Sequence, residues 1–425
     1  MAGSTDGSSK ATHRAAAPAV ILWLTAAAAI PCGLAAQDPG TGPSPLSLSL
    51  GGYVHVVTGI HDTGFPIPGE DPTSAFNGDV LRLQWGGSWE DWLSVDVHNR
   101  LQTRISTSDR EVAGSVAGLG VTRDPGRAVD LESVWIEKDR LRVWHDLDRA
   151  SVTFYTPAAD LTVGRQGIAW GNSLLFPVVD LWAPFSPFEL DTEVRPGIDA
   201  IRALAYPLPG LEIDAVVADR GERDPWSGGV RGTWSLASAD IYGAVARIWD
   251  EGMAAGGVTW LFETTRARAE VLLPWNLNSD QWMDPRATLG FDWLGNRWTV
   301  SAEYHFNGLG TSDPDEYPSV LTSEPYARGE SYFLGRHYIG GLASWTLDRD
   351  ERFHLNGSVL LNVQDPSAAF FPALRWAPGQ TTSVSVGGLF TLGEHPTVPP
   401  GMIPDIRSEY GTYGTLGYTR ISVFF

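Results

Sequence analysis

The last thirteen residues, Tyr413–Phe425 with the sequence YGTLGYTRISVFF, decide how the rest of the chain is interpreted. Ile421, Val423 and Phe425 stand at odd positions, and polar Ser422 stands between them. A period of two is typical of a β-strand that separates an apolar environment from a polar one. The stretch therefore predicts a final strand with one apolar face, whose surroundings must be inferred from the rest of the chain.

The N-terminus has the composition of an export signal. Lys10 and Arg14 supply positive charge, Ala15–Ile30 is apolar, and small residues at 34–36 precede Gln37. Charged, apolar and small residues in this order are typical of a cleaved signal peptide. The apolar run of about 15 residues is short for a membrane helix, which needs about 20.

We therefore expect a signal peptide over residues 1–36, a linker over residues 37–46 and one domain over residues 47–425. Cys32 is the single cysteine and lies inside the expected signal. Cleavage after Ala36 would leave a mature chain without thiol or disulfide chemistry.

The composition points to a membrane β-barrel. The chain has 18 Trp, 12 Tyr, 16 Phe and 47 Gly in 425 residues, and only 19% of its residues are charged. Soluble proteins usually have about 25% charged residues. Membrane barrels place apolar residues outside, polar residues inside and aromatic residues at both interfaces. The net charge of −20 argues against a nucleic-acid partner.

Strand-like alternation recurs along the chain. In Trp298–Phe306, Val300 and Tyr304 would face one side, and Ser301 and Glu303 the other. Similar segments predict an all-β fold, a transmembrane antiparallel β-barrel of about 18 strands. This count places residues 129–145 as a hairpin within an external loop, and 16 strands is the alternative.

The connections alternate between short and long. Short turns are expected at residues 90–91, 157–159, 207–209, 236–238, 264–265, 295–296, 348–351 and 377–380. Long connections are expected at residues 59–79, 105–128, 166–197, 219–227, 274–284, 307–333 and 393–408. If Phe425 ends in the periplasm, all these short turns fall on the periplasmic side and the long connections outside, as in bacterial barrels. Short turns at 250–252 and 365–367 are the expected exceptions.

One segment resembles a known group of proteins. GRQ (164–166) is followed by WG (170–171), by Asp180 with Pro184-Phe185, and by RPGIDAIR (195–202). Together with the terminal Phe425, this order resembles outer-membrane porin-like barrels, the broad group that includes alginate-export-type channels. The resemblance implies a channel in the bacterial outer membrane. The acidic composition does not favour an anionic polymer such as alginate as the solute.

The loop over residues 166–197 is rich in Trp, Phe and Pro, so we expect it to fold into the lumen rather than extend into water. Charged residues on it and beside it would then form a pore constriction that filters solutes by charge and size. The alternative is that these residues are paired and join the loop to the wall. The candidate residues are Arg165, Gln166, Trp170, Asp180, Glu189, Asp191, Glu193, Arg195, Asp199 and Arg202.

The leading hypothesis is a channel or porin for passive or facilitated diffusion of small or oligomeric solutes, among them oligosaccharides. A structural barrel or one that anchors surface polysaccharide is the alternative, and an outer-membrane enzyme is a further one. No catalytic, cofactor or metal site is expected, because neither a nucleophile motif nor metal-ligand spacing stands out. The expected partners are outer-membrane lipid and the barrel-assembly machinery, and the sequence leaves the oligomeric state open.

Overall fold

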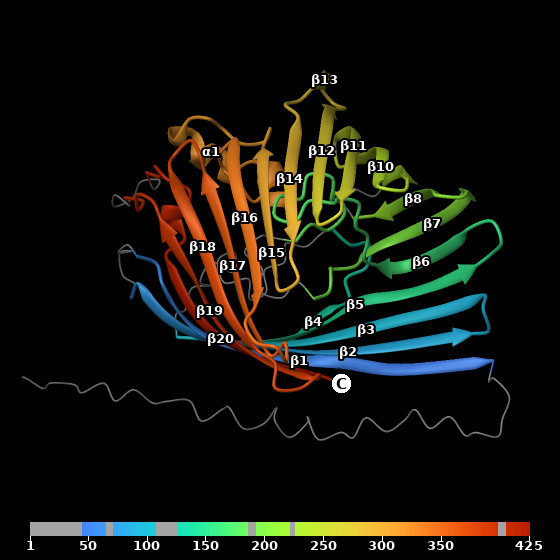
Figure 1. Cartoon of the computed structure of the whole chain (residues 1–425), viewed down its shortest axis with the longest axis horizontal. Helices are drawn as coiled ribbons and strands as arrows, with labels where there is room; N and C mark the ends of the chain where they lie inside the picture. Colours follow the sequence, from blue (N-terminus) through green and yellow to red (C-terminus); the bar gives the residue numbers. More distant parts are fainter. Residues whose placement is uncertain are drawn as a thin grey trace, which may run out of the picture. The chain divides into compact units, whose positions relative to one another are not determined.

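The computed structural model describes residues 45–64, 71–107, 126–138, 140–185, 193–221, 226–397 and 405–425. The predicted signal peptide and most of the predicted linker lie outside these residues. The described chain is almost entirely β-structure (Figure 1). Among the described residues, no helix has the length and apolar character needed to cross a membrane.

Within the described residues, twenty strands belong to one sheet, and every pairing between them is antiparallel. The first ten are β1 (Leu46–Asp62), β2 (Thr73–Trp89), β3 (Leu93–Ser106), β4 (Glu132–Lys138), β5 (Leu141–Tyr155), β6 (Asp160–Gln166), β7 (Ile198–Leu208), β8 (Leu211–Asp219), β9 (Ser227–Ser235) and β10 (Ala239–Ile248). The others are β11 (Glu251–Phe262), β12 (Thr265–Asn276), β13 (Gln281–Trp282), β14 (Arg286–Leu294), β15 (Trp298–Phe306), β16 (His337–Thr346), β17 (Phe353–Asn362), β18 (Ser367–Trp376), β19 (Thr382–Leu392) and β20 (Thr415–Phe424).

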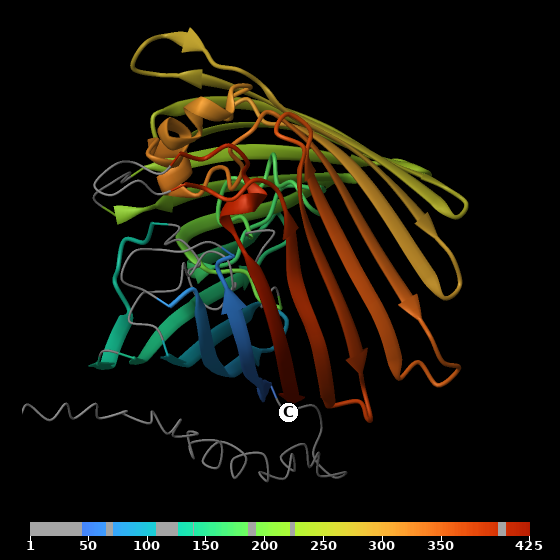
Figure 2. The same ribbon diagram turned by 90° about the vertical axis from the view of Figure 1, so that its left-hand side faces the viewer.

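The strands close into a barrel of 18. β1 pairs with both β2 and β20, so the two ends of the sheet meet, and Figure 2 shows the blue and dark red strands side by side. Among the described strands, β4 pairs only with β5 and β13 pairs only with β12, so these two of the twenty strands are not part of the closed wall. The predicted count of 18 is confirmed. The hairpin predicted over residues 129–145 is present as β4 paired with the first part of β5. That part of β5 also pairs with β3, so residues 141–145 belong to the wall and the prediction that the whole hairpin lies in an external loop is wrong.

The predicted final strand is also present, although it begins two residues later than the quoted stretch. The short helix η4 (Tyr410–Thr412) precedes it, and Gly414 has a φ of 72°. That conformation favours glycine, so the chain turns here before β20 begins. At the other end of β20, the backbone N–H of Phe425 donates to the carbonyl of Gly52 at 3.0 Å. The C-terminal residue thus takes part in closing the barrel.

Short and long connections lie at opposite ends of the strands, as the alternation along the chain predicts. The turns that follow β2, β5, β7, β9, β11, β14, β16 and β18 are short and lie at the same end as Phe425. Long connections follow β1, β3, β6, β8, β12, β15 and β19. The two expected exceptions follow β10 and β17. The connection after β15 contains η3 (Pro314–Glu316), α1 (Tyr317–Leu321) and α2 (Glu324–Arg328).

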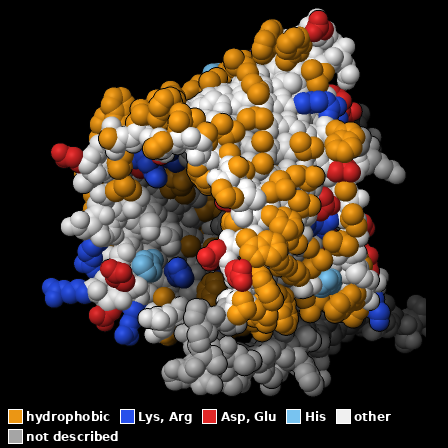
Figure 3. All heavy atoms as spheres, turned by 90° about the vertical axis from the view of Figure 1, so that its right-hand side faces the viewer, with side chains coloured by type: hydrophobic (Ala, Val, Ile, Leu, Met, Phe, Trp, Pro, Cys, Tyr) orange, Lys and Arg blue, Asp and Glu red, His pale blue; other side chains and the backbone are white. Residues whose placement is uncertain are grey.

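The two faces of the wall differ as a membrane barrel requires. On β15, Val300 and Tyr304 are 43% and 38% exposed, whereas Ser301 and Glu303 are buried. Apolar side chains cover much of the outer wall in Figure 3, beside a hollow whose rim carries charged side chains. Exposed tryptophans stand near the short-turn ends of the strands, among them Trp293, Trp345 and Trp376. An aromatic belt at this level is typical of a membrane interface.

Candidate functional site

The candidate site is the connection between β6 and β7, of which the structure describes residues 167–185 and 193–197. Its aromatic residues Trp170, Phe176 and Trp182 are fully buried. The first and last belong to an apolar cluster with residues of β8, β10 and β12 such as Tyr242 and Leu272. Burial of these side chains removes apolar area from water, so the loop packs against the wall instead of projecting into solvent.

The tip of this loop is bound by a carboxylate of the wall. Glu303 of β15 accepts hydrogen bonds from the backbone N–H groups of Leu174 and Leu175 at 2.8 and 2.9 Å. Its side chain is 1% exposed and lies 3.0 Å from the guanidinium of Arg268 on β12. The buried carboxylate is thus satisfied by donors from the loop and by a cation from the wall.

Neighbouring wall residues extend this attachment. Arg268 donates to the carbonyl of Asn172 at 2.9 Å and to Asp292 on β14 at 2.7 Å. Glu270, also on β12, accepts a hydrogen bond from the hydroxyl of Ser173 at 2.6 Å. The inward face of β12 thus supplies both an anion and a cation to the same turn of the loop.

Trp170 forms the next attachment. Its indole Nε1–H donates to Asp214 of β8 at 2.8 Å, and its ring packs edge to face on Trp182 with centroids 5.2 Å apart. Asp214 also pairs with Arg202 of β7 at 2.8 Å. The carboxylate therefore connects two wall strands and one loop residue.

The two ends of the loop are held by ion pairs. Arg165 pairs with Asp199 at 2.8 Å, and its guanidinium also donates to the carbonyl of Leu147 at 2.9 Å. Arg195 pairs with Asp180 and donates to the carbonyl of Ala183 at 2.7 Å. Burial raises the pKa of Asp180 to about 6, although the guanidinium of Arg195 acts in the opposite direction.

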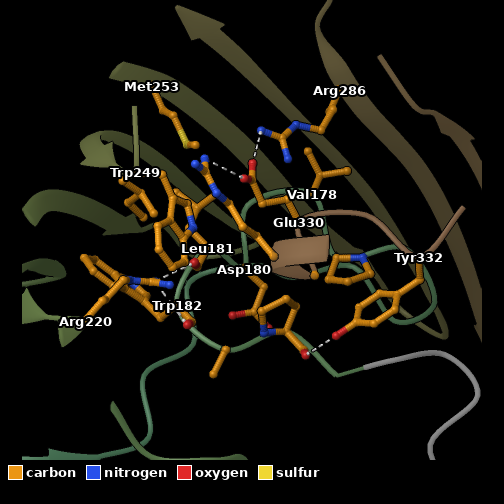
Figure 4. A pocket seen from close by; sticks show the side chains of 16 residues that line it. Val178, Asp180, Leu181, Trp182, Arg220, Trp249, Met253, Arg286, Glu330 and Tyr332 are labelled. Carbon is orange, nitrogen blue, oxygen red and sulfur yellow. Dashed lines mark hydrogen bonds and ion pairs between the residues drawn. The ribbon is translucent and has the colours of Figure 1, made fainter. Parts of the chain in front are cut away.

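A pocket lies between the loop and the connection that follows β15 (Figure 4). Arg220 donates to the carbonyls of Leu181 and Trp182 at 3.0 and 3.1 Å, and the hydroxyl of Tyr332 donates to Pro184 at 3.2 Å. Arg220 thus joins the connection after β8 to this loop, and Tyr332 joins the connection after β15 to it. Among the described residues, no group of three or more His, Cys, Asp or Glu side chains is placed to hold a metal ion.

A serine and a histidine meet on the wall, and they bear on the enzyme alternative. The His55 ring nitrogen Nδ1 lies 2.8 Å from the hydroxyl of Ser422, and both residues are 2% exposed. The other ring nitrogen lies 3.4 Å from the guanidinium of Arg420. A serine–histidine contact alone does not define a hydrolase, which also needs an acid or amide that orients the imidazole.

No protein-family model matches the chain, and no curated protein sequence matches it. Among solved structures, OccAB2 of Acinetobacter baumannii is similar, with a TM-score of 0.53, 9% identity and coverage of 89% of this chain and 98% of that chain. OccAB4 of the same species has a TM-score of 0.52, 9% identity and coverages of 88% and 97%. OccK9 (OpdG) of Pseudomonas aeruginosa has a TM-score of 0.52, 10% identity and coverages of 89% and 98%. The fold is that of an outer-membrane porin-like barrel.

Within this porin-like barrel, the structure brings together several of the ten residues expected at the constriction. Arg165 with Asp199, and Asp180 with Arg195, form ion pairs, and Arg202 and Trp170 share Asp214. Gln166 is buried and donates to the carbonyl of Ala200 at 3.1 Å. Glu193 pairs with Arg420 of β20 at 3.1 Å. Glu189 and Asp191 lie outside the described residues. That these residues narrow a passage stays a prediction.

Sequence reasoning did not assign a role to Arg268 or Glu270, two of the residues that hold the loop. The sequence does contain a signal for their position, because alternation along Thr265–Asn276 places both residues on the same strand face as Arg266. What the pattern lacks is how the loop lies against the wall, which decides that these side chains meet residues near 172.

Proposed function

We propose that this protein is a channel of the bacterial outer membrane through which small or oligomeric solutes diffuse. A porin-like barrel of 18 strands with an apolar outer face and a polar inner face supports this proposal. The single observation that carries it is the attachment of the loop after β6 to inward side chains of β8, β12 and β15. A loop held in this way would narrow the passage at one level.

The charge accessible to a solute would come from the end of this loop. Glu193 has a side chain that is 44% exposed, and its partner Arg420 is 17% exposed. In contrast, Asp214, Asp292 and Glu303 are buried and paired with arginine. A solute would therefore meet opposed charges at Glu193 and Arg420, the pair that joins the loop to β20. Such charges discriminate between solutes most strongly where the passage is narrow.

Conductance across planar bilayers tests the proposal. The wild-type protein should give stepwise conductance, and deletion of Leu174–Glu189 should raise the unit conductance roughly twofold by widening the passage. Asp280→Gly is the matched control, since Asp280 is exposed at the tip of the hairpin after β12 and has a φ of 56° that glycine tolerates. This control should conduct as the wild type does.

The outcomes separate the leading function from its alternative. A folded, inserted barrel without stepwise conductance in either form would favour a structural or polysaccharide-anchoring role. The observation that favours this alternative is the apolar cluster between the loop and the wall. A conducting wild type whose conductance is unchanged by the deletion would retain the channel and refute the constriction.

A further inference from the structure

The pocket between the loop after β6 and the connection after β15 contains buried polar atoms (Figure 4). The side chains of Trp182, Asp180 and Glu330 line it, and none of them is more than 9% exposed. Among the described residues, none forms a hydrogen bond with the indole Nε1–H of Trp182, with Oδ1 of Asp180 or with either carboxylate oxygen of Glu330. Buried polar atoms normally have partners, so these atoms indicate a site for a polar ligand.

Both acids of the pocket already have cations beside them. Asp180 pairs with Arg195 through its other oxygen, Oδ2. Glu330 lies between two guanidinium groups, that of Arg328 at 3.9 Å and that of Arg286 at 4.0 Å. A cationic ligand would be repelled by these arginines at close range. The acids therefore offer hydrogen-bond acceptors but do not call for a further positive charge.

The three arginines that line the pocket are engaged as well. Arg286 lies 3.4 Å from Glu251, and Arg328 lies 2.7 Å from Glu324. Arg220 donates to two carbonyl groups of the loop after β6. An anionic ligand would have to displace these partners and would also meet the carboxylates of the pocket. The surroundings therefore favour a neutral ligand that both donates and accepts hydrogen bonds.

The size of the pocket restricts this ligand further. The pocket has about 30 Å³ of room for water-sized groups, and it is partly open. One such group needs roughly 10–15 Å³, so two of them fit. A hydroxyl group has the size of a water molecule, and it donates one hydrogen bond while accepting others. Two hydroxyl groups on adjacent carbon atoms match both the room and the bonding of the pocket.

We propose that this pocket binds a vicinal diol of a neutral solute, the group that saccharides and other polyols carry. The hydroxyls would donate to the carboxylate oxygens of Asp180 and Glu330 and accept from the Nε1–H of Trp182. Apolar side chains such as Val178 and Met253, which form much of the remaining lining, would contact the carbon atoms of the solute. This inference rests on the proposed channel function and names the class of solute that the channel would hold.

Binding of D-glucose to the purified protein tests the pocket. Saturation-transfer NMR detects weak binding, and an amine-oxide detergent is used because a detergent with a sugar head group would compete. The wild type should bind glucose. It should bind triethylene glycol, which is of similar mass but has no vicinal hydroxyls, roughly tenfold more weakly or less, because the buried polar atoms would then stay without partners.

Trp182→Phe is the most specific variant, because it removes the Nε1–H and keeps an aromatic ring. That N–H donates to no described residue, so the variant should fold as the wild type does and bind glucose roughly fivefold more weakly. Glu330→Gln keeps the shape of the side chain but loses its charge, which should weaken binding roughly tenfold. Trp226→Phe is the matched control, since this exposed tryptophan does not line the pocket, and it should bind glucose as the wild type does.

The folding of each variant is checked by its resistance to protease. Equal binding of glucose by the wild type and by Trp182→Phe would overturn the proposal. So would a folded wild type that binds no glucose, since water alone would then suffice for these polar atoms, or one that binds both solutes equally. Stepwise conductance without glucose binding would retain the channel and refute the diol site. Glucose binding that Trp182→Phe weakens, in a barrel that does not conduct, would retain the site and refute the channel.

Discussion

Two buried carboxylates in the connections, Asp180 and Glu409, are held by different partners. Asp180, in the loop after β6, pairs with the guanidinium of Arg195. Glu409, in the connection after β19, accepts hydrogen bonds from the hydroxyl of Tyr338 and, at 2.9 Å, from the amide of Asn362. Among the residues that the structure describes, no arginine forms an ion pair with Glu409.

The surroundings of Glu409 add a second carboxylate instead of a cation. Asp365 accepts from the backbone N–H of Glu409 at 2.7 Å and from the hydroxyl of Tyr317 at 2.8 Å. We call Glu409, Asp365, Tyr338, Asn362 and Tyr317 the Glu409 cluster. Burial raises the pKa of Glu409 to about 8, and the nearby Asp365 adds to this while the hydrogen bond from Tyr338 lowers it.

The difference shows what an arginine contributes to a buried acid. Burial raises the pKa of both groups, but that of Asp180 reaches only about 6, since Arg195 stabilises its charged form. At pH 7 Asp180 is therefore mostly ionised and Glu409 mostly protonated. The loop after β6 is held by charge, whereas the Glu409 cluster is held by hydrogen bonds that include a neutral acid.

The largest expected effect comes from removing a wall carboxylate that attaches the loop after β6. Glu303→Ala should destabilise the attachment of the loop by about 3 kcal/mol, because Leu174 and Leu175 lose their acceptor and buried Arg268 loses one of its two anions. Hydrogen exchange at residues 172–178 should become faster. Glu351→Ala, at an exposed turn, should change nothing. Unchanged exchange at residues 172–178 would mean that apolar packing alone holds the loop.

A change of pH should separate the two regions. A raised pKa stabilises the folded state at low pH, and this contribution is lost as the pH rises from the ordinary value of 4.5 through about 8 for Glu409. For Asp180 the same loss occurs between 3.8 and about 6. Raising the pH from 7 to 9 should therefore loosen the Glu409 cluster by about 1.4 kcal/mol, the equivalent of one pKa unit, and leave the surroundings of Asp180 unaffected.

Hydrogen exchange at residues 405–414 and 176–184 measures both sides of this comparison. The raw rates must first be corrected for the intrinsic pH dependence of exchange. Glu409→Gln cannot ionise and should remove the response at residues 405–414. If the variant responds as the wild type does, another group in the cluster is responsible.

The smallest expected effect concerns a single hydrogen bond. Trp170→Phe removes the indole donor to Asp214 but keeps an aromatic ring, and Arg202 continues to balance the carboxylate. The cost should be about 1 kcal/mol in the stability of the loop. Proteolysis within the loop reports it, and Trp226→Phe, at an exposed tryptophan, is the control. A cost as large as that of Glu303→Ala would show that the two attachments act as one unit.

Much of the wall could be predicted, since each strand carries its own evidence. Val300 and Ser301 differ in polarity, and the structure places them on opposite faces of β15. The lengths of the connections likewise predicted which turns lie together at one end of the barrel and which lie at the other. The loop was harder to predict, because its attachments join residues such as Leu174 and Glu303 that are far apart in the chain. No local pattern records such a distance.

The alternation of residues and the lengths of connections, both local properties, determined by themselves that this chain forms a β-barrel with about 18 strands. Only the tertiary structure decided which charges meet. Arg165 and Asp199 were recognised as candidates, but their pairing, and the partnership of Glu303 with Arg268, depend on the closure of the sheet.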